Sequence, residues 1–303
     1  GMIWLFIVFT VGVASADPGE LRYRVHDDHV AIVGFREIDG FLEIPGTIDG
    51  LPVTTIEEDA FAIAGLTGVV VPDSVIEIKD GAFSINSRIS SVWLGRGVEI
   101  IADSAFFMCR GLLEFVVHPD NPNFVSVDGV LFDKEVRTLE SYPQGRTGGY
   151  VIPETVVRID PFGFDSCKYL NSVILPNGLV EIGRFGIGYC EALTSIRIPA
   201  SVRKINGFAF MGCENLEAMY FDGDAPLLEG EFGIPSSVGH IYYLPKTTMW
   251  SLSFGNRPTQ MLPMIETDSP DFGIITSNGG EAGFGFSALG PANSAVIVEG
   301  SDP

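Results

Sequence analysis

Basic residues are scarce in this chain, and their scarcity excludes one class of partner. Eighteen lysines and arginines stand against 39 acidic residues, which gives a formal net charge of −21 at pH 7 and a pI near 4.4. A surface this acidic repels phosphate backbones, so we expect no nucleic-acid partner. The same deficit excludes a polybasic patch for binding an anionic membrane surface.

Cysteine and histidine each occur only four times in 303 residues. Four cysteines are too few for a scaffold held together by disulfides. The sequence also has no CxxC pair, no HExxH or GxSxG motif, no glycine-rich phosphate loop and no EF-hand string. We therefore predict no catalytic residues, no metal site and no cofactor, and we expect that the protein is not an enzyme.

The chain has one long apolar run, at its N-terminus. Residues 2–13 are uncharged and apolar, and Ala14-Ser15-Ala16 follows them with the small residues that signal peptidase accepts. The run is shorter than the roughly 20 residues that a membrane-spanning helix needs. It predicts a signal peptide over residues 1–16, hence a secreted or cell-surface protein with no membrane span in the mature chain. A short buried helix is the alternative.

An internal repeat of 23 residues organises the middle of the chain. A strand-like segment ending in proline recurs as VVVPDSV, VIPETVV, ILPNGLV and RIPASV, and Pro153, Pro176 and Pro199 follow one another at steps of 23. In six units an isoleucine is followed, five residues later, by a large apolar residue. The large apolar residues of this column are Phe61, Phe83, Phe106, Phe164, Ile187 and Phe210. Because one unit cannot bury its own apolar face, the units must stack into a solenoid with a continuous core.

Each unit predicts a short strand and then a turn of helix. The segments before proline, such as SVILP and SIRIP, alternate and are rich in β-branched residues, which is typical of strands. Proline has no N–H to give to a continuing ladder, so the strand ends there. We expect a short helical turn around the large apolar column. The predicted class is therefore α/β, with a parallel sheet on one face of the solenoid.

These residues resemble the BspA-like leucine-rich-repeat family of bacterial surface and secreted proteins. The segment SIRIPASVRKINGFAFMGCENL, residues 195–216, is similar to the family's unit, in which a strand ending in Ile-Pro is followed by Ser-Val, Ile, Ala-Phe, Cys and Leu. The resemblance covers about residues 21–262 and implies a leucine-rich-repeat solenoid. Some members of the family act in adhesion, so the resemblance also implies protein–protein interaction.

The two ends of the chain differ from the repeat. Residues 17–41 include an alternating stretch around Asp27-Asp28 and predict a β-hairpin that caps the N-terminal end of the solenoid. The solenoid itself occupies residues 42–262. Residues 263–303 predict a linker and the first strands of a β-sandwich-type module. Because such a sandwich has about seven strands, we expect the module to be incomplete.

One interruption falls inside the repeat. The step from His118 to Pro153 is 35 residues, so 12 residues are inserted into the period. Apolar and polar residues alternate on both sides of residues 133–135, which is a hairpin signal. We predict a β-flap at about residues 121–147 that projects from the solenoid.

The four cysteines occupy a single column of the repeat. Cys109, Cys167, Cys190 and Cys213 each follow the large apolar column by three residues and precede a leucine by three. This placement predicts that they point into the core. Side chains on stacked coils run parallel and do not converge on disulfide geometry, so we expect free buried thiols, with a disulfide as the alternative.

The outward face of the predicted sheet carries the candidate site. Counting back from each proline, alternation places positions −1 and −3 in the core and position −2 outward. A solvated face is normally polar, whereas this column is apolar and aromatic, which suits a binding groove. The alternative is that a strand column favours β-branched residues whatever it faces. The candidate binding residues are Trp93, Tyr220, Tyr243, Arg197, Val70, Val116, Val151 and Ile174.

Tryptophan, tyrosine and arginine dominate binding hot spots, so the sequence predicts protein–protein interaction or adhesion through the sheet face. The partner is a protein or a glycan. A glycan-binding surface module is the alternative, since aromatic rings on a shallow groove also suit sugar rings. A third possibility is a non-catalytic part of a larger exported protein or enzyme.

Overall fold

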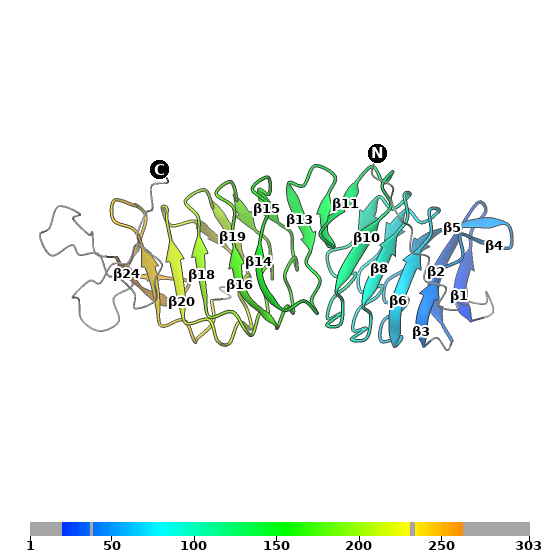
Figure 1. Ribbon diagram of the computed structural model, residues 1–303, viewed down its shortest axis with the longest axis horizontal. Coiled ribbons are helices and arrows are strands. Elements are labelled where there is room, and N and C mark those ends of the chain that lie inside the picture. The colour runs from blue at the N-terminus through cyan, green and yellow to red at the C-terminus, as the bar shows by residue number, and fades with distance from the viewer. Residues whose placement is uncertain (1–19, 37–38, 231–233, 263–303) are drawn as a thin grey trace, which may run out of the picture.

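The computed structural model describes residues 20–36, 39–230 and 234–262, which form an elongated stack of coils (Figure 1). All elements in these ranges are strands. They contain no helix that is long and apolar enough to cross a membrane. The signal peptide predicted at residues 1–16 and the module predicted at residues 263–303 lie outside the described residues.

Each coil contributes one strand of four to six residues to the same side of the solenoid, which we call the long-strand face. Hydrogen bonds join these strands into three parallel groups. The first group is β3, β6, β8 and β10, the second is β14 and β16, and the third is β18, β20, β22 and β24. The predicted parallel sheet with a 23-residue spacing is thereby confirmed. The strands are β3 (Gly40–Glu43), β6 (Leu66–Val71), β8 (Ser91–Leu94), β10 (Glu114–Val117), β14 (Gly148–Val151), β16 (Leu170–Ile174), β18 (Ser195–Ile198), β20 (Ala218–Phe221), β22 (His240–Tyr243) and β24 (Arg257–Met261).

A second row of parallel strands, which we call the second sheet, runs along the solenoid in two hydrogen-bonded groups, one that ends at β9 and one that includes β15 to β21. Most of its strands are only two or three residues long. The isoleucine column of the repeat lies in this sheet, where Ile56 pairs with Ile78 and Ile159 pairs with Ile182. The strands are β5 (Leu51–Ile56), β7 (Glu77–Ile78), β9 (Ile100–Ile101), β15 (Arg158–Ile159), β17 (Glu181–Ile182), β19 (Lys204–Asn206) and β21 (Leu227–Glu229).

The turns that we predicted as helical are not helical, so the α/β class is wrong for the described residues. In an α-helix, each backbone N–H bonds to the carbonyl four residues back. Here alternate N–H groups bond to the next coil: Phe61 donates to the carbonyl of Ala82 at 2.7 Å, and Ile63 donates to Ser84 at 3.0 Å. The residues between them, Ala60 and Ala62, donate to carbonyls three residues back. Residues on either side of the core aromatic adopt left-handed backbone angles, with φ of 53° at Asp59 and 58° at Ile63. The left-handed residues change the direction of the backbone within the turn, so that the N–H groups of Phe61 and Ile63 point along the stack toward the next coil.

The N-terminal end of the solenoid begins with a hairpin. Strand β1 (Leu21–Val25) pairs antiparallel with β2 (Val30–Phe35), and β2 then pairs parallel with β5 of the second sheet. Strand β4 (Thr47–Ile48) pairs antiparallel with β5. At the other end, β23 (Ser253–Phe254) pairs antiparallel with β24.

The inserted segment forms a three-stranded meander of β11 (Phe124–Val127), β12 (Val130–Asp133) and β13 (Thr138–Ser141). The expectation that it projects as a flap is wrong, because β13 pairs parallel with β15 and so continues the second sheet. Strand β12 is apolar on both sides. Leu131 packs in the core of the preceding coils, whereas Val130 and Phe132 pack in the core of the following coils. A strand buried on both sides cannot project into solvent.

The large apolar column is buried along the whole stack, as the repeat predicted. Phe61 and Phe83 stack with ring centroids 5.4 Å apart, and Phe83 and Phe106 follow at 5.5 Å. After the insert, Phe164 continues the column against Tyr142, at 5.0 Å. Such aromatic pairs add to the free energy gained from area burial alone.

The four cysteines are buried in the core, as their shared column predicted. Cys109 Sγ lies 3.1 Å from the carbonyl oxygen of Phe83, and Cys213 Sγ lies 3.0 Å from that of Ile187. Burial raises the pKa of the Cys109 thiol to about 12, which keeps it protonated and able to donate.

We expect Phe164→Ala and Phe210→Ala each to destabilise the protein by about 3–5 kcal/mol, the usual cost of truncating a core aromatic. Both rings are almost fully buried, with coils on either side that leave little room to relax. Denaturant unfolding measures the effect. The matched control is Phe41→Ala, since Phe41 is 38% exposed and should cost much less. Equal stability of all three variants and the native protein would show that the column does not form the core.

We also expect all four thiols to be free in solution. Thiol titration without reductant should report four groups in the unfolded protein and a much slower reaction in the native protein, because the sulfur atoms are buried. A count below four in the unfolded, unreduced chain would reveal a disulfide.

Candidate functional site

The side chains of the long-strand face alternate as the sequence predicted. On and after β16, Val173 and Leu175 are buried, while Ile174 between them is 59% exposed. On β8, Val92 and Leu94 are buried and Trp93 is 46% exposed. The outward column is therefore accessible from solvent.

The outward column falls into three groups rather than one continuous stripe. Hydrogen-bonded registers place Glu43, Val70, Trp93 and Val116 side by side on the first group of strands. Val151 and Ile174 are neighbours on the second group, and Arg197 and Tyr220 are neighbours on the third. The main interruption lies between β10 and β14, where the insert separates two strands that the repeat alone would pair.

Tyr243 does not belong to the outward column, so its assignment to the outward face is wrong. It pairs in register with Phe221, and its ring stacks on Trp250 with centroids 4.9 Å apart. The step from Phe221 to Tyr243 is 22 residues, one short of the period, and a slip of one residue exchanges the two faces of a strand. Tyr242 takes the outward place and stacks on Tyr220 at 5.2 Å.

Polar groups surround this tyrosine pair. Arg197 Nε donates to both carboxylate oxygens of Asp222, at 2.7 and 2.9 Å. The ring of His240 lies 6.2 Å from that of Tyr242. Sequence reasoning missed Tyr242 and His240, because the adjacent tyrosines of IYYL fit either register and the shortened step was invisible without the backbone.

A shallow concavity of about 510 Å³ occupies the interruption between β10 and β14. The rings of Tyr142 and Tyr150 lie 4.8 Å apart in its wall. The guanidinium of Arg146 lies 5.9 Å from the centre of the Tyr142 ring, and its Nε donates to the carbonyl of Leu113 at 2.6 Å. Burial, the largest cause, raises the pKa of Tyr150 to about 12, so its phenol remains a neutral hydrogen-bonding group.

A glycine sets the depth of this concavity. The N–H of Gly145 donates to the carbonyl of Leu112 at 2.7 Å, and a Cβ at this position would lie 2.8 Å from the backbone of Gly111. Only glycine allows the returning chain to come so close. The concavity was not predicted, although the break in the period and the string QGRTGGY at its end mark the place.

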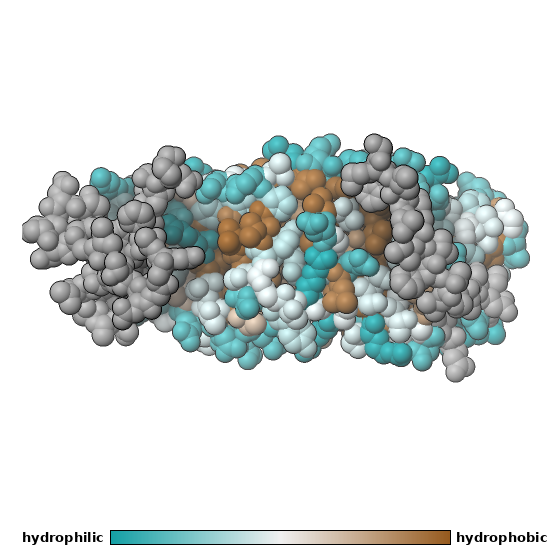
Figure 2. All heavy atoms as spheres, viewed as in Figure 1, coloured by the Kyte–Doolittle hydropathy of each residue, from teal (hydrophilic) through white to brown (hydrophobic). Residues whose placement is uncertain are grey.

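Figure 2 shows apolar residues gathered near the middle of the long-strand face, with hydrophilic residues between them. Val151, at 63% exposed, and Ile174 are the most exposed apolar members of the predicted column. These side chains keep apolar area in contact with water in the folded protein. Removing such area from water in a complex is favourable.

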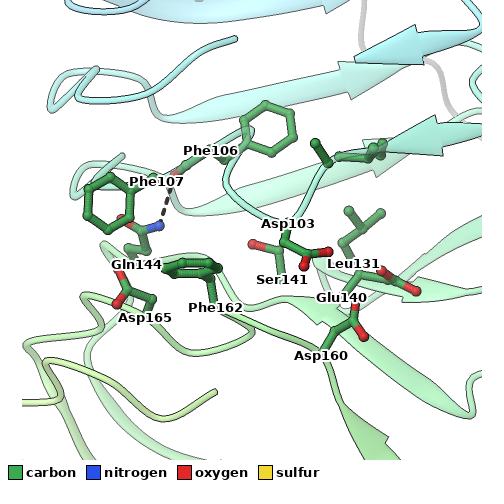
Figure 3. A pocket seen from close by; sticks show the side chains of 12 residues that line it. Asp103, Phe106, Phe107, Leu131, Glu140, Ser141, Gln144, Asp160, Phe162 and Asp165 are labelled. Atoms are coloured by element: carbon green, nitrogen blue, oxygen red, sulfur yellow. Dashed lines mark hydrogen bonds between the residues drawn. The ribbon is translucent and has the colours of Figure 1, made fainter. Parts of the chain in front are cut away.

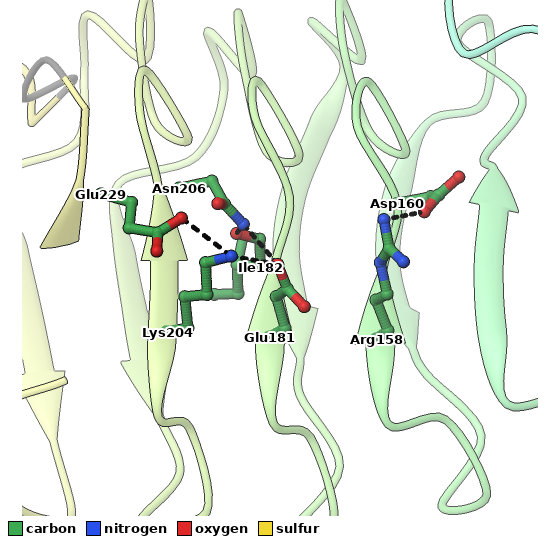
Figure 4. Close-up of polar contacts among 7 residues, drawn as sticks. All are labelled: Arg158, Asp160, Glu181, Ile182, Lys204, Asn206 and Glu229. Atoms are coloured by element: carbon green, nitrogen blue, oxygen red, sulfur yellow. Dashed lines mark hydrogen bonds and ion pairs between the residues drawn. The ribbon is translucent and has the colours of Figure 1, made fainter. Parts of the chain in front are cut away.

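The outward side of the second sheet carries several ion pairs. Lys204 Nζ lies 3.2 Å from Oε1 of Glu181 and 2.9 Å from Oε2 of Glu229 (Figure 4). These carboxylates, with the Glu229 hydrogen bond foremost, raise the pKa of Lys204. Asn206 adds a hydrogen bond to the same Glu181 at 2.7 Å. The second sheet also exposes apolar side chains, Ile100 by 54% and Leu227 by 59%, but it has no aromatic group comparable with Trp93 or the stacked Tyr220 and Tyr242 among its described strands.

The long-strand face suits binding better than catalysis. Its charged groups include Glu43 and Glu114 on the first group of strands, Arg146, which lies on an aromatic ring, and Arg197, which is paired with Asp222. Across residues 20–36, 39–230 and 234–262, no three or more His, Cys, Asp or Glu side chains are arranged to hold a metal ion. Apolar side chains, two arginines and stacked tyrosines are groups that recognise a surface.

Comparison with known families and structures agrees with this architecture. The family model of the BspA type leucine-rich-repeat region matches residues 45–133 and 147–228, in six copies. A search of curated proteins finds no match.

Three solved structures illustrate the likeness. A leucine-rich repeat protein from Eubacterium ventriosum is 20% identical, with 74% of this chain and 76% of that chain covered and a TM-score of 0.49. The leucine-rich repeat protein of T. pallidum is 23% identical, with coverage of 77% and 87% and a TM-score of 0.43. The pneumococcal vaccine antigen PcpA is 16% identical, with coverage of 74% and 86% and a TM-score of 0.40.

Proposed function

We propose, since this chain belongs to the BspA-type leucine-rich-repeat family, that it is a non-catalytic protein that binds a partner protein through its long-strand face. The family model matches most of the solenoid. Repeat solenoids of this kind present extended surfaces rather than closed active sites, and they are generally used for binding. We propose the long-strand face as the binding surface and its outward side chains as the contact residues.

The exposure of large apolar side chains on an otherwise strongly charged protein carries the proposal. Trp93, Val151 and Ile174 are all about half exposed or more, although the chain has a net charge of −21. Burying such area gains roughly 25 cal/mol per Å². A tryptophan in this position offers a large rigid contact at low entropic cost.

The arrangement fits a partner that lies along the solenoid and crosses the strands. Neighbouring strands are about 4.8 Å apart, so the outward column repeats at a spacing that successive side chains of a partner can follow. The concavity between β10 and β14 lies between Trp93 on one side and Ile174 on the other. A bulky side chain of the partner would anchor there against Tyr142 and Tyr150.

Charge adds selectivity to this contact. Among the described residues, Arg146 has no carboxylate within ion-pair distance, and its guanidinium is held in place by the Leu113 carbonyl and the Tyr142 ring. A fixed guanidinium suits a carboxylate of the partner, because both groups are planar and can form two parallel hydrogen bonds.

We further propose that the protein is secreted or displayed on the cell surface. The apolar run over residues 2–13 and the small residues Ala14, Ser15 and Ala16 after it support export through a signal peptide. Edman sequencing of the protein purified from its own culture medium or cell surface tests this, and an N-terminus at Asp17 is expected.

We expect the double variant Trp93→Ala/Tyr220→Ala to weaken partner binding by at least about 1 kcal/mol, because both rings would be lost from the contact. The partner is isolated by pull-down against secreted proteins, and its affinity for each variant is then measured with purified components. Melting temperature should change little, since Trp93 is 46% exposed and Tyr220 is half-buried on the same face.

Two controls lie on the second sheet. Leu227→Ala removes a side chain that is 59% exposed, and Lys79→Ala removes one charge of an ion pair with Glu57. Both should keep full affinity. If the double variant binds as tightly as the native protein while a control does not, the partner docks on the second sheet. If the native protein binds saturably to a glycan array and the double variant does not, the ligand of the long-strand face is a glycan and not a protein.

A further inference from the structure

A small pocket lies between the insert and the coils on either side of it, away from the long-strand face (Figure 3). Its volume is about 20 Å³, which is room for one water molecule or one ammonium group. Its walls come from the coil before the insert, from β12 and β13, and from the coil that follows β15. The pocket therefore exists only because the insert interrupts the repeat.

Four carboxyl groups line this pocket: Asp103, Glu140, Asp160 and Asp165. Arg158 Nη2 pairs with Asp160 Oδ1 at 2.8 Å. Glu140 has only acidic neighbours among the charged groups that influence it, and burial is the main cause that raises its pKa to about 8. Arg110 attracts Asp165 as well, but two arginines cannot neutralise Asp103, Asp160 and Asp165 together, so the carboxyl groups remain in excess at neutral pH even with Glu140 protonated.

Two buried oxygen atoms at one end of the pocket have no donor among the described residues. They are Gln144 Oε1 and Asp165 Oδ1, on side chains that are 4% and 1% exposed. The orientation of Gln144 is fixed, because its Nε2 donates to the carbonyl of Phe106 at 2.9 Å. Asp165 uses its other oxygen, Oδ2, to accept from Ser166 Oγ at 2.7 Å. Leaving a buried acceptor without a donor costs about 1–3 kcal/mol.

Aromatic rings complete this end of the pocket. Phe107 and Phe162 meet edge to face with centroids 5.9 Å apart, and Figure 3 shows them beside Gln144 and Asp165. Asp103, Glu140 and Asp160 lie together at the opposite end. A cation beside Asp165 would thus contact an anion and a neutral oxygen next to two aromatic rings, and the face of a ring attracts a cation whereas its edge does not.

We propose that this pocket binds a primary ammonium group, the tip of a lysine side chain presented by a partner protein. An ammonium group has three N–H donors and can satisfy both Gln144 Oε1 and Asp165 Oδ1 at once. Calcium prefers six to eight oxygen ligands, which the aromatic end does not supply, and the described residues hold no metal-binding cluster. The strongly negative chain favours a basic partner.

Binding should depend on pH through Asp165. Burial, partly offset by the Ser166 hydrogen bond and by attraction to Arg110, raises the pKa of Asp165 to about 6. Asp103, Glu140 and Asp160 lie at the opposite end of the pocket, and Arg110 is the charged group that acts on Asp165. Below pH 6 an ammonium group must displace a proton from Asp165, so its affinity should fall about tenfold between pH 7 and pH 5, a range in which Glu140 stays mostly protonated because its pKa is about 8.

The test is a titration of the full chain with n-butylammonium chloride at pH 8, followed by protein-detected NMR. Saturable binding is expected, and Nα-acetyl-lysinamide should bind as well. n-Butanol, which has no charge, and tetramethylammonium, which has no N–H donor, should not compete. Equal binding of either, or displacement of n-butylammonium by calcium chloride, would overturn the proposal.

The decisive variant is Asp165→Asn, which keeps the shape of the side chain and removes its charge. It should bind n-butylammonium at least about tenfold more weakly, a loss of about 1.4 kcal/mol, and should lose the pH dependence. Phe162→Leu is a second variant at a half-buried position and should also weaken binding. The control is Glu217→Gln, an exposed carboxyl outside the pocket, with no expected effect.

The proposal is overturned if n-butylammonium does not saturate, or if Phe162→Leu and any folded Asp165→Asn protein bind as the native protein does. In that case water satisfies the two buried acceptors. The pocket is separate from the long-strand face, so this result leaves the proposed function standing.

Discussion

In five coils of the solenoid the backbone carbonyl of the large apolar residue accepts a hydrogen bond from a buried side chain of the next coil, and this pairing constrains the rest of the structure. A buried carbonyl that loses a donor costs free energy, although the carbonyls of Phe106 and Phe164 also accept from the backbone N–H three residues on, at 3.3 and 3.4 Å. Here a buried side chain of the next coil donates to the carbonyl of the large apolar residue in the coil before it. The pairs are Asn86 to Phe61, Cys109 to Phe83, Gln144 to Phe106, Cys190 to Phe164 and Cys213 to Ile187, at 2.8 to 3.3 Å. These five positions therefore require a buried side-chain donor, which is asparagine in one coil, glutamine in another and cysteine in three. Hydrogen bonding to the carbonyl accounts for the buried thiols without a metal or a disulfide.

The insert changes the path of the chain but keeps this pairing. Gln144 donates to Phe106 from 38 residues away, where Cys109 donates to Phe83 from 26. To reach that carbonyl, the chain must come back close to the coil before the insert, and Gly145 permits the approach at the next residue. The returning segment does not restore the ladder between β10 and β14. The concavity on the long-strand face and the pocket near the second sheet are both consequences of this detour.

The columns of the solenoid could be predicted from the sequence because each depends on a repeated residue type. The buried phenylalanines, the buried cysteines and the outward exposure of Trp93 and Ile174 follow from a 23-residue period and from alternation along a strand. The second sheet was not predicted, although its isoleucine column repeats, because strands of two residues are too short to show the alternation that identifies a strand. The assignment of Tyr243 to the outward face was wrong because the preceding loop is one residue shorter than the period. This shift exchanges the inward and outward side chains of the strand without changing its composition. The flap failed because alternation indicates a hairpin but not that both of its sides are covered.

A solenoid without interruption offers a partner nearly the same surface at every coil, so it provides affinity without a unique register. The features that break this equivalence are those that the repeat does not generate: the insert, the shortened step before Tyr243, and the paired Arg197 and Asp222 beside the tyrosine stack. They lie at the middle and toward the C-terminal end of the long-strand face, while Trp93 lies on the N-terminal side of the concavity. A partner that places a bulky side chain in the concavity can therefore contact Trp93 on one side and the tyrosines on the other in one orientation only. On the proposed function, the repeat would supply the area for binding, and its irregularities would fix where along that area a partner sits.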